Sequence, residues 1–244
     1  MKRHLIFCFL LPFLCSTAIA GPPFRTDDPE PVEYQNWEFY AASTGTFGDG
    51  YSLTAPHVEI NYGVLPDVQL HLIAPLEYVN PKGENAHYGY GDTELGVKYR
   101  FIHESDWIPQ IGIFPLVELP TGDEDKNLGT GRIQAFFPLW LQKSWEPWKT
   151  YGGGGYWINP AKGNRNFWFL GWEAEREISE YLTLGAEIFH QTASEKHGDS
   201  DTRFNIGGYI NLTKSHHLLF SAGRDISGPS DFSYYIGYLL TLGD

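Results

Sequence analysis

Apolar and polar side chains alternate with a period of two along most of this chain, and the alternation is clearest in residues 91–101 and 108–120. In a β-strand, successive side chains point to opposite faces, whereas a helix would not separate these two sets of residues. The two stretches are joined by a short polar turn, so the pattern predicts a hairpin with one apolar and one charged face. The charged side chains of the first stretch are Asp92, Glu94, Lys98 and Arg100.

The same alternation recurs along the rest of the chain. Each stretch has about 9 to 12 residues, which is the length a tilted strand needs to cross a bilayer. No apolar run after residue 20 is long enough for a transmembrane helix, so a membrane-spanning form of this chain has to be a barrel. The further alternating stretches are residues 37–42, 57–62, 69–74, 132–142, 168–177, 182–188, 203–211, 218–222 and 232–242.

Short and long connections also alternate. The short turns fall near residues 63–67, 102–107, 144–148, 178–181 and 213–215, and the longer loops near 44–51, 80–90, 121–131, 160–166, 193–201 and 225–230. A meander with short turns at one rim and long loops at the other is typical of outer-membrane barrels. We therefore predict an all-β fold, a transmembrane antiparallel up-and-down barrel of about 12 strands over residues 35–244, with both termini in the periplasm. A secreted β-sandwich or a lipocalin-like barrel is the soluble alternative, but neither requires this alternation of loop lengths.

The N-terminal residues predict export. Lys2 and Arg3 precede an apolar run over residues 5–14 and a small-x-small motif that ends at Ala20, which is typical of a secretory signal peptide over residues 1–20, cleaved between Ala20 and Gly21. Residues 21–34 contain four prolines and are predicted to form an extended periplasmic lead-in to the barrel. Both cysteines, Cys8 and Cys15, precede the predicted cleavage site, so no disulfide is expected in the mature chain.

Charge and aromatic residues refine this picture. The net charge of -13 disfavours nucleic acid and anionic surfaces as partners. Trp107, Trp145, Trp148 and Tyr181 fall beside the short turns, where an aromatic girdle is expected at a membrane interface.

If the apolar face meets lipid, the charged face must line the lumen. An Arg or Lys facing lipid near the midplane would cost about 2–4 kcal/mol. For any single residue, the expected role is cross-strand pairing that fills a narrow barrel. Taken together, an acid-rich lumen favours cations, and Tyr40, Trp140 and Trp157 are candidates to line a path for polar or aromatic solutes. The lumen-lining candidates are His57, Glu59, His71, Glu77, Asp92, Glu94, Lys98, Arg100, Glu118, Arg132, Glu173, Glu175, Glu187 and Arg203.

The sequence motifs for catalysis and for metal binding are weak. Ser52 and Ser221 are candidate nucleophiles with His57 or His71 as base, but the chain has no GxSxG elbow. The two histidines fall on the two strands of one predicted hairpin, where lumen hydrogen bonding is favoured over a metal pair. The run Asp123 to Asp125 is either a solvated loop or a bridge through divalent cations to lipopolysaccharide. No cofactor or metal is predicted.

Several stretches resemble one family of outer-membrane proteins, described as "Putative MetA-pathway of phenol degradation". They include GPPFRTDDPEPVEY at 21–34, APHVEINYGVLPDVQLHLIAPLEY at 55–78, YGYGDTELGVKYRF at 88–101, PQIGIFPLVELPTGD at 109–123, FFPLWLQKSW at 136–145, WKTYGGGGYWIN at 148–159, LTLGAEIFHQT at 182–192 and HLLFSAGR at 217–224. The resemblance implies an outer-membrane β-barrel that passes small molecules, aromatic ones among them. The chain departs from many such barrels in ending Leu242-Gly243-Asp244 and not on an aromatic residue.

The sequence thus predicts a channel in the bacterial outer membrane that passes small solutes by passive or facilitated diffusion. The expected partners are outer-membrane lipid, lipopolysaccharide, the solute and the barrel-insertion machinery, with no nucleic acid. A closed barrel with an adhesive or envelope-structural role is the alternative, and an outer-membrane hydrolase is the third.

Overall fold

A computed structural model describes residues 22–243, so the predicted signal peptide and the cleavage between Ala20 and Gly21 lie outside the described residues. No helix among residues 22–243 is long and apolar enough to cross a membrane. Apart from the 3₁₀-helix η1 (Glu124–Lys126), the elements of this part of the chain are strands. They are β1 (Trp37–Phe47), β2 (Tyr51–Leu65), β3 (Val68–Asn80), β4 (His87–Tyr90), β5 (Thr93–Ile102), β6 (Gln110–Ile113), β7 (Leu116–Leu119), β8 (Gln134–Trp145), β9 (Trp148–Ile158), β10 (Phe167–Ser179), β11 (Leu182–Gln191), β12 (Asp201–Asn211), β13 (His216–Ser227) and β14 (Phe232–Leu242).

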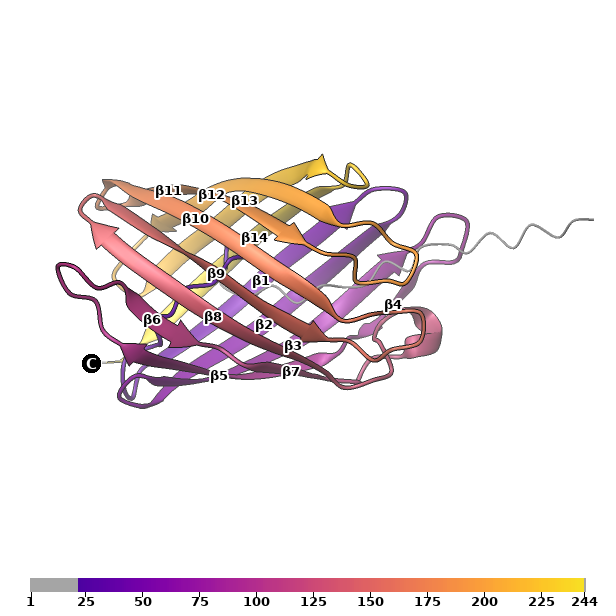
Figure 1. Cartoon of the computed structure of the whole chain (residues 1–244), viewed down its shortest axis with the longest axis horizontal. Coiled ribbons are helices and arrows are strands. Elements are labelled where there is room, and N and C mark those ends of the chain that lie inside the picture. Colours follow the sequence, from indigo (N-terminus) through magenta and orange to yellow (C-terminus); the bar gives the residue numbers. More distant parts are fainter. Residues whose placement is uncertain (1–21, 244) are drawn as a thin grey trace, which may run out of the picture.

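The strands form a closed antiparallel barrel, as predicted (Figure 1). The first and last strands close the ring along their full length, from the pair Trp37 and Leu242 to the pair Phe47 and Phe232. Two positions in the ring are each shared by two shorter strands. β4 and β5 both pair with β3, and β6 and β7 both lie between β5 and β8. The barrel therefore has twelve strand positions, which confirms the predicted number.

The predicted single strand over residues 108–120 is interrupted at Phe114 and Pro115. Proline has no N–H to donate to a neighbouring strand, so it ends the hydrogen-bonded ladder of β6, and β7 resumes at Leu116. The break does not change the alternation of faces. Gln110, Leu116 and Glu118 all remain buried on the inner side of the barrel.

The connections separate into two rims. The connections at residues 66–67, 103–109, 146–147, 180–181 and 212–215 form the short-turn rim, where β1 also begins and β14 ends, and all of them except 103–109 have two to four residues. Longer loops at residues 81–86, 120–133, 159–166 and 192–200 form the opposite, long-loop rim. Two connections at that rim, residues 48–50 and 228–231, are shorter than predicted because the flanking strands extend further.

The two faces of the sheet differ in polarity as the alternation predicted. Apolar side chains such as Leu170, Ile188, Ile206 and Ile236 are exposed on the outside. Glutamate, glutamine and asparagine side chains are buried inside, among them Glu94 and Glu173. This inverted arrangement is stable where hydrocarbon surrounds the barrel.

Candidate functional site in the barrel lumen

Most of the N-terminal residues 22–32 are buried inside the barrel, whereas residues 33–35 are exposed at its short-turn rim. Phe24, Thr26 and Asp27 are fully enclosed, with at most 2% of their surface exposed. The segment passes to the short-turn rim, where Tyr34 forms a bridge to Gly63 next to the β2–β3 turn. Figure 1 shows this indigo start of the described chain within the ring of strands. The short-turn half of the lumen is therefore occupied by the chain itself.

Side chains on three strands hold this segment by charge and hydrogen bonds. Glu187 on β11 accepts the backbone N–H groups of Arg25 and Thr26, at 2.9 and 2.8 Å. Lys98 on β5 donates to Asp27 at 2.9 Å and also reaches Asp28. These charge-assisted bonds are stronger than neutral ones. A third strand contributes Gln69, which accepts the N–H of Val32 at 2.9 Å.

Glycines in the wall give the segment room. A Cβ atom at Gly171 would lie 2.2 Å from the hydroxyl of Thr26, and one at Gly63 would lie 1.9 Å from the carbonyl oxygen of Glu33. Both distances are too short for real atoms, so a larger residue at either position would displace the segment. The inner wall is thus shaped around residues 22–36, which the sequence alone did not reveal.

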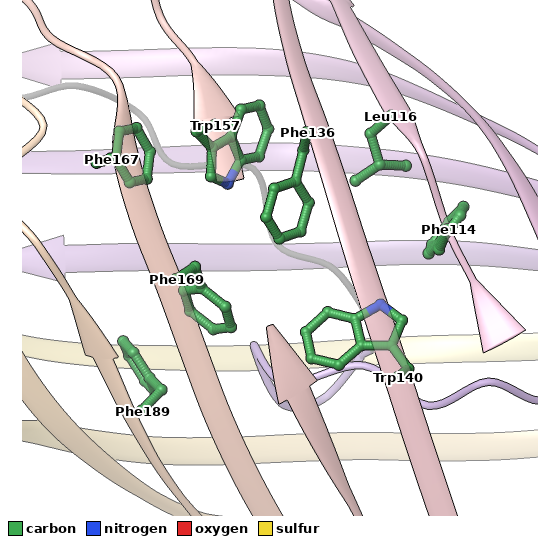
Figure 2. Close-up of a cluster of buried hydrophobic side chains, with 8 residues drawn as sticks. All are labelled: Phe114, Leu116, Phe136, Trp140, Trp157, Phe167, Phe169 and Phe189. Atoms are coloured by element: carbon green, nitrogen blue, oxygen red, sulfur yellow. The ribbon is translucent and has the colours of Figure 1, made fainter. Parts of the chain in front are cut away.

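An aromatic cluster lines one side of the lumen (Figure 2). It joins side chains of β8 to β11 with Phe114, from the break between β6 and β7, and Leu116, the first residue of β7. Phe136 and Trp157 stack with their ring centroids 4.7 Å apart. The guanidinium group of Arg25 lies 5.2 Å from the centre of the Phe189 ring, close enough for a cation–π contact. The members are Phe114, Leu116, Phe136, Trp140, Trp157, Phe167, Phe169 and Phe189.

A chain of buried hydrogen-bonding groups lies on β2, β3 and β5. Glu59 lies between the two predicted histidines, 3.6 Å from His57 Nε2 and 3.6 Å from His71 Nδ1. The other nitrogen of His71 contacts Glu94 Oε1 at 2.9 Å. The two histidines therefore lie on either side of one carboxylate. Among residues 22–243, no group of three or more His, Cys, Asp or Glu side chains is arranged to hold a metal ion.

A cavity of about 1220 Å³ fills the long-loop half of the lumen. Pro23 and Arg25 of the N-terminal segment border it on the side of the short-turn rim, and residues of the long loops, such as Lys162 and Asp199, border its other end. Eleven aspartates and glutamates line the cavity against four arginines and lysines, so its wall is strongly acidic. The lumen is thus open on the long-loop side of residues 22–36 and filled on the short-turn side.

Most of the predicted lumen residues lie on the inner wall. Arg100 instead lies near the short-turn rim, where it bonds Asp67 and Gln110. Arg132 is exposed in the loop before β8, at the mouth of the cavity, and Asp92 is half-buried between β4 and β5. The buried residues are His57, Glu59, His71, Glu77, Glu94, Lys98, Glu118, Glu173, Glu175, Glu187 and Arg203.

Several of these buried residues have partners that the alternation did not single out. Lys149 bonds Glu175 at 2.9 Å, and Asp225 bonds Arg203 at 2.6 Å. Trp140 and Trp157, predicted to line the lumen, belong to the aromatic cluster. Of the candidate nucleophiles, Ser221 donates its hydroxyl proton to the carbonyl oxygen of Pro23, and Ser52 borders the cavity. The hydrogen bond of Ser221 therefore holds the N-terminal segment.

A closed ring with an apolar exterior and a polar interior defines the class of outer-membrane β-barrels. Residues 36–235 match the family described as "Putative MetA-pathway of phenol degradation", and the chain belongs to this family. None of the curated proteins searched matches the chain.

Solved structures share the fold. The COG4313 outer membrane channel from Pseudomonas putida F1 has a TM-score of 0.74 and 16% identity, with 88% of this chain and 98% of that chain covered. The NanC porin has a TM-score of 0.61 and 10% identity, with 84% and 100% covered. The KdgM porin has a TM-score of 0.57 and 10% identity, with 84% and 99% covered.

Proposed function

We propose that the protein is a channel of the bacterial outer membrane that passes small solutes by diffusion. The observation that carries this proposal is the lumen, which combines an acidic cavity of about 1220 Å³ with a wall too polar for a hydrophobic core. A barrel that served only as an envelope anchor needs no such cavity. The named structures that share the fold are channels and porins, which supports the same reading.

The orientation belongs to the proposal. We place the short-turn rim, with both ends of the barrel strands, at the periplasmic side and the long loops outside, as in other outer-membrane barrels. Trp107, Trp145, Trp148 and Tyr181 are exposed at the short-turn rim, where an interfacial girdle is expected. Lipid and lipopolysaccharide then surround the outer apolar face.

Transport requires residues 22–36 to move or to loosen. The wall holds this segment through the side chains of Glu187, Gln69 and Lys98, and a strand-like bridge joins Tyr34 to Gly63. A segment held in this way can leave the lumen without breaking the hydrogen bonds between the barrel strands. Its departure would uncover the aromatic cluster, which suits solutes with apolar rings.

Conductance in planar bilayers tests the proposal. The mature chain from Gly21 is expected to give discrete current steps, and a variant that lacks residues 22–33 is expected to give larger ones. A gel shift between boiled and unboiled samples is the control for folding of both proteins. Correctly folded protein that never conducts, with or without residues 22–33, would contradict the proposed function and favour the adhesive or structural role.

A further inference from the structure

One arginine of β13 faces outward on the apolar exterior of the barrel. Along this strand, Leu219, Ser221 and Asp225 are buried on the inner side. The alternation therefore places Arg224 on the outer side, where its side chain is exposed. It lies three residues before the end of β13, at the long-loop rim. An arginine there costs much less than one at the bilayer midplane, because its guanidinium group reaches the lipid headgroups.

Phenylalanines flank Arg224 on both neighbouring strands. Its direct partner on β12 is Phe204, and its direct partner on β14 is Phe232, which is 46% exposed. Phe47 at the end of β1 continues this band, with its ring centre 6.3 Å from that of Phe232. Aromatic side chains on the outer face near a rim are typical of the depth of the lipid headgroups. Arg224 is thus a cation at headgroup depth.

Arg224 has no counterion within the barrel. Among residues 22–243, its side chain forms no ion pair and no hydrogen bond. The next residue, Asp225, points inward and pairs with Arg203 at 2.6 Å. A guanidinium group has five N–H donors in a planar fork, which matches an anion with several acceptor oxygens, above all phosphate. Because Arg224 is exposed on the lipid-facing side, such a phosphate has to come from a headgroup.

Two further cations without a carboxylate partner lie at the same rim. Backbone hydrogen bonds join the β9–β10 loop to the β11–β12 loop, and these loops carry Arg165 and Lys196. Both side chains are exposed, and neither forms an ion pair within the described part of the chain. In two other connections of this rim, Lys82 and Lys126 each pair with an aspartate. Unpaired positive charge therefore lies over β10–β13, which are neighbours in the ring (Figure 1).

We propose that this face of the barrel, centred on Arg224, binds the phosphate groups of lipopolysaccharide. Cations spread over several strands suit a headgroup with more than one phosphate, which lipopolysaccharide has and phosphatidylglycerol lacks. The phenylalanines beside Arg224 then contact the acyl chains of the same lipid. The inference goes beyond the channel and depends only on the proposed orientation, with the long loops outside.

Native mass spectrometry of the folded full barrel in detergent tests the proposal. The probes are lipid A, which is the anchor of lipopolysaccharide, lipid A treated with phosphatase, and phosphatidylglycerol. The wild type is expected to bind lipid A about tenfold or more tighter than either other probe, because charge-assisted hydrogen bonds to phosphates are lost in both. Arg224→Gln is expected to lose most of this preference. Arg224→Lys keeps the charge without the planar donors and is expected to retain part of it.

Arg176→Gln is the matched control, because Arg176 is also exposed on the outer face but lies near the short-turn end of β10, beside Trp148. It is expected to bind lipid A like the wild type. Unchanged binding by Arg224→Gln overturns the proposal. Equal affinity of the wild type for lipid A and for either other probe also overturns it, and this comparison decides alone if Arg224→Gln does not fold. The channel proposal fails separately, through absence of current, whatever the lipids show.

Discussion

Asp67 illustrates how one residue fixes the short-turn rim. It occupies the β2–β3 turn and accepts hydrogen bonds from Arg100 Nε and Nη2, at 2.8 and 2.6 Å. His103 Nε2 lies 3.0 Å from its other oxygen. Burial by itself would raise the pKa of Asp67, but the hydrogen bonds and charges of Arg100 and His103 outweigh it, so the pKa lies below its ordinary value.

This lowered pKa predicts a loss of stability in acid. A group whose pKa is lower in the folded state stabilises that state above its unfolded pKa, about 3.9 for Asp, and the stabilisation disappears as the pH falls through the folded pKa. Asp67→Asn is therefore expected to lower the free energy of unfolding by about 1 kcal/mol or less at pH 7, since the pair is partly exposed, and by less at pH 2.5. Urea unfolding in lipid vesicles at both pH values measures this. Equal destabilisation at the two pH values would show that the ionised carboxylate of Asp67 is not the source of the stabilisation.

For single residues, the sequence predicts which face of the sheet a side chain takes, but it does not predict which residue that side chain binds. A period of two is enough to assign Glu94 or Lys98 to the inner wall, because the assignment depends only on neighbours along the strand. The partner of Lys98 is Asp27, 71 positions earlier in the chain. That pairing depends on where the proline-rich segment lies, and the segment has no periodicity that would place it.

The strands are the next scale, and β12 shows what holds them in the membrane. Ile206 points outward, 61% exposed, while its neighbour Asn205 points inward and bonds Glu187. Ile206 pairs with Ala186 and Ala222, so this part of the outer face is apolar on both sides. The exposure of Ile206 is favourable only if hydrocarbon surrounds it.

A charge at Ile206 tests that condition. Ile206→Lys is expected to cost about 2–4 kcal/mol of stability in lipid vesicles, because lysine near the bilayer midplane loses its hydration. Ile206→Ala removes the same side chain without adding charge and serves as the control. If lysine and alanine destabilise the barrel equally, position 206 does not face lipid.

Element boundaries were the less predictable part of the strands. The alternation runs through residues 108–120 without a break, but Pro115 ends one hydrogen-bonded ladder there and starts another. Arg132 was counted with the strand that follows, yet β8 begins at Gln134. Alternation reports which face a side chain takes and not whether the backbone is paired.

For the whole molecule, the lumen divides into a filled half and an open half. Residues 22–36 fill the short-turn half, bound to Glu187, Lys98 and Gln69, and the acidic cavity occupies the other. The channel we propose is therefore obstructed by its own N-terminal segment, and a solute can pass only if that segment moves.

A reversible lock on the segment tests this claim most directly. A Cβ atom at Gly171 would lie 3.1 Å from Thr26 Cβ, closer than the roughly 3.5–4.5 Å of disulfides, so a bridge here needs a small shift of the segment. Replacing Thr26 also removes the hydroxyl that would lie 2.2 Å from that Cβ atom, and residues 21–244 contain no cysteine. Thr26→Cys combined with Gly171→Cys therefore allows one disulfide between segment and wall. Single-channel conductance in planar bilayers is measured before and after reduction, with Thr26→Cys alone as the control. We expect little or no current from the oxidised protein and full current steps after reduction, and the same conductance in both states would contradict the account.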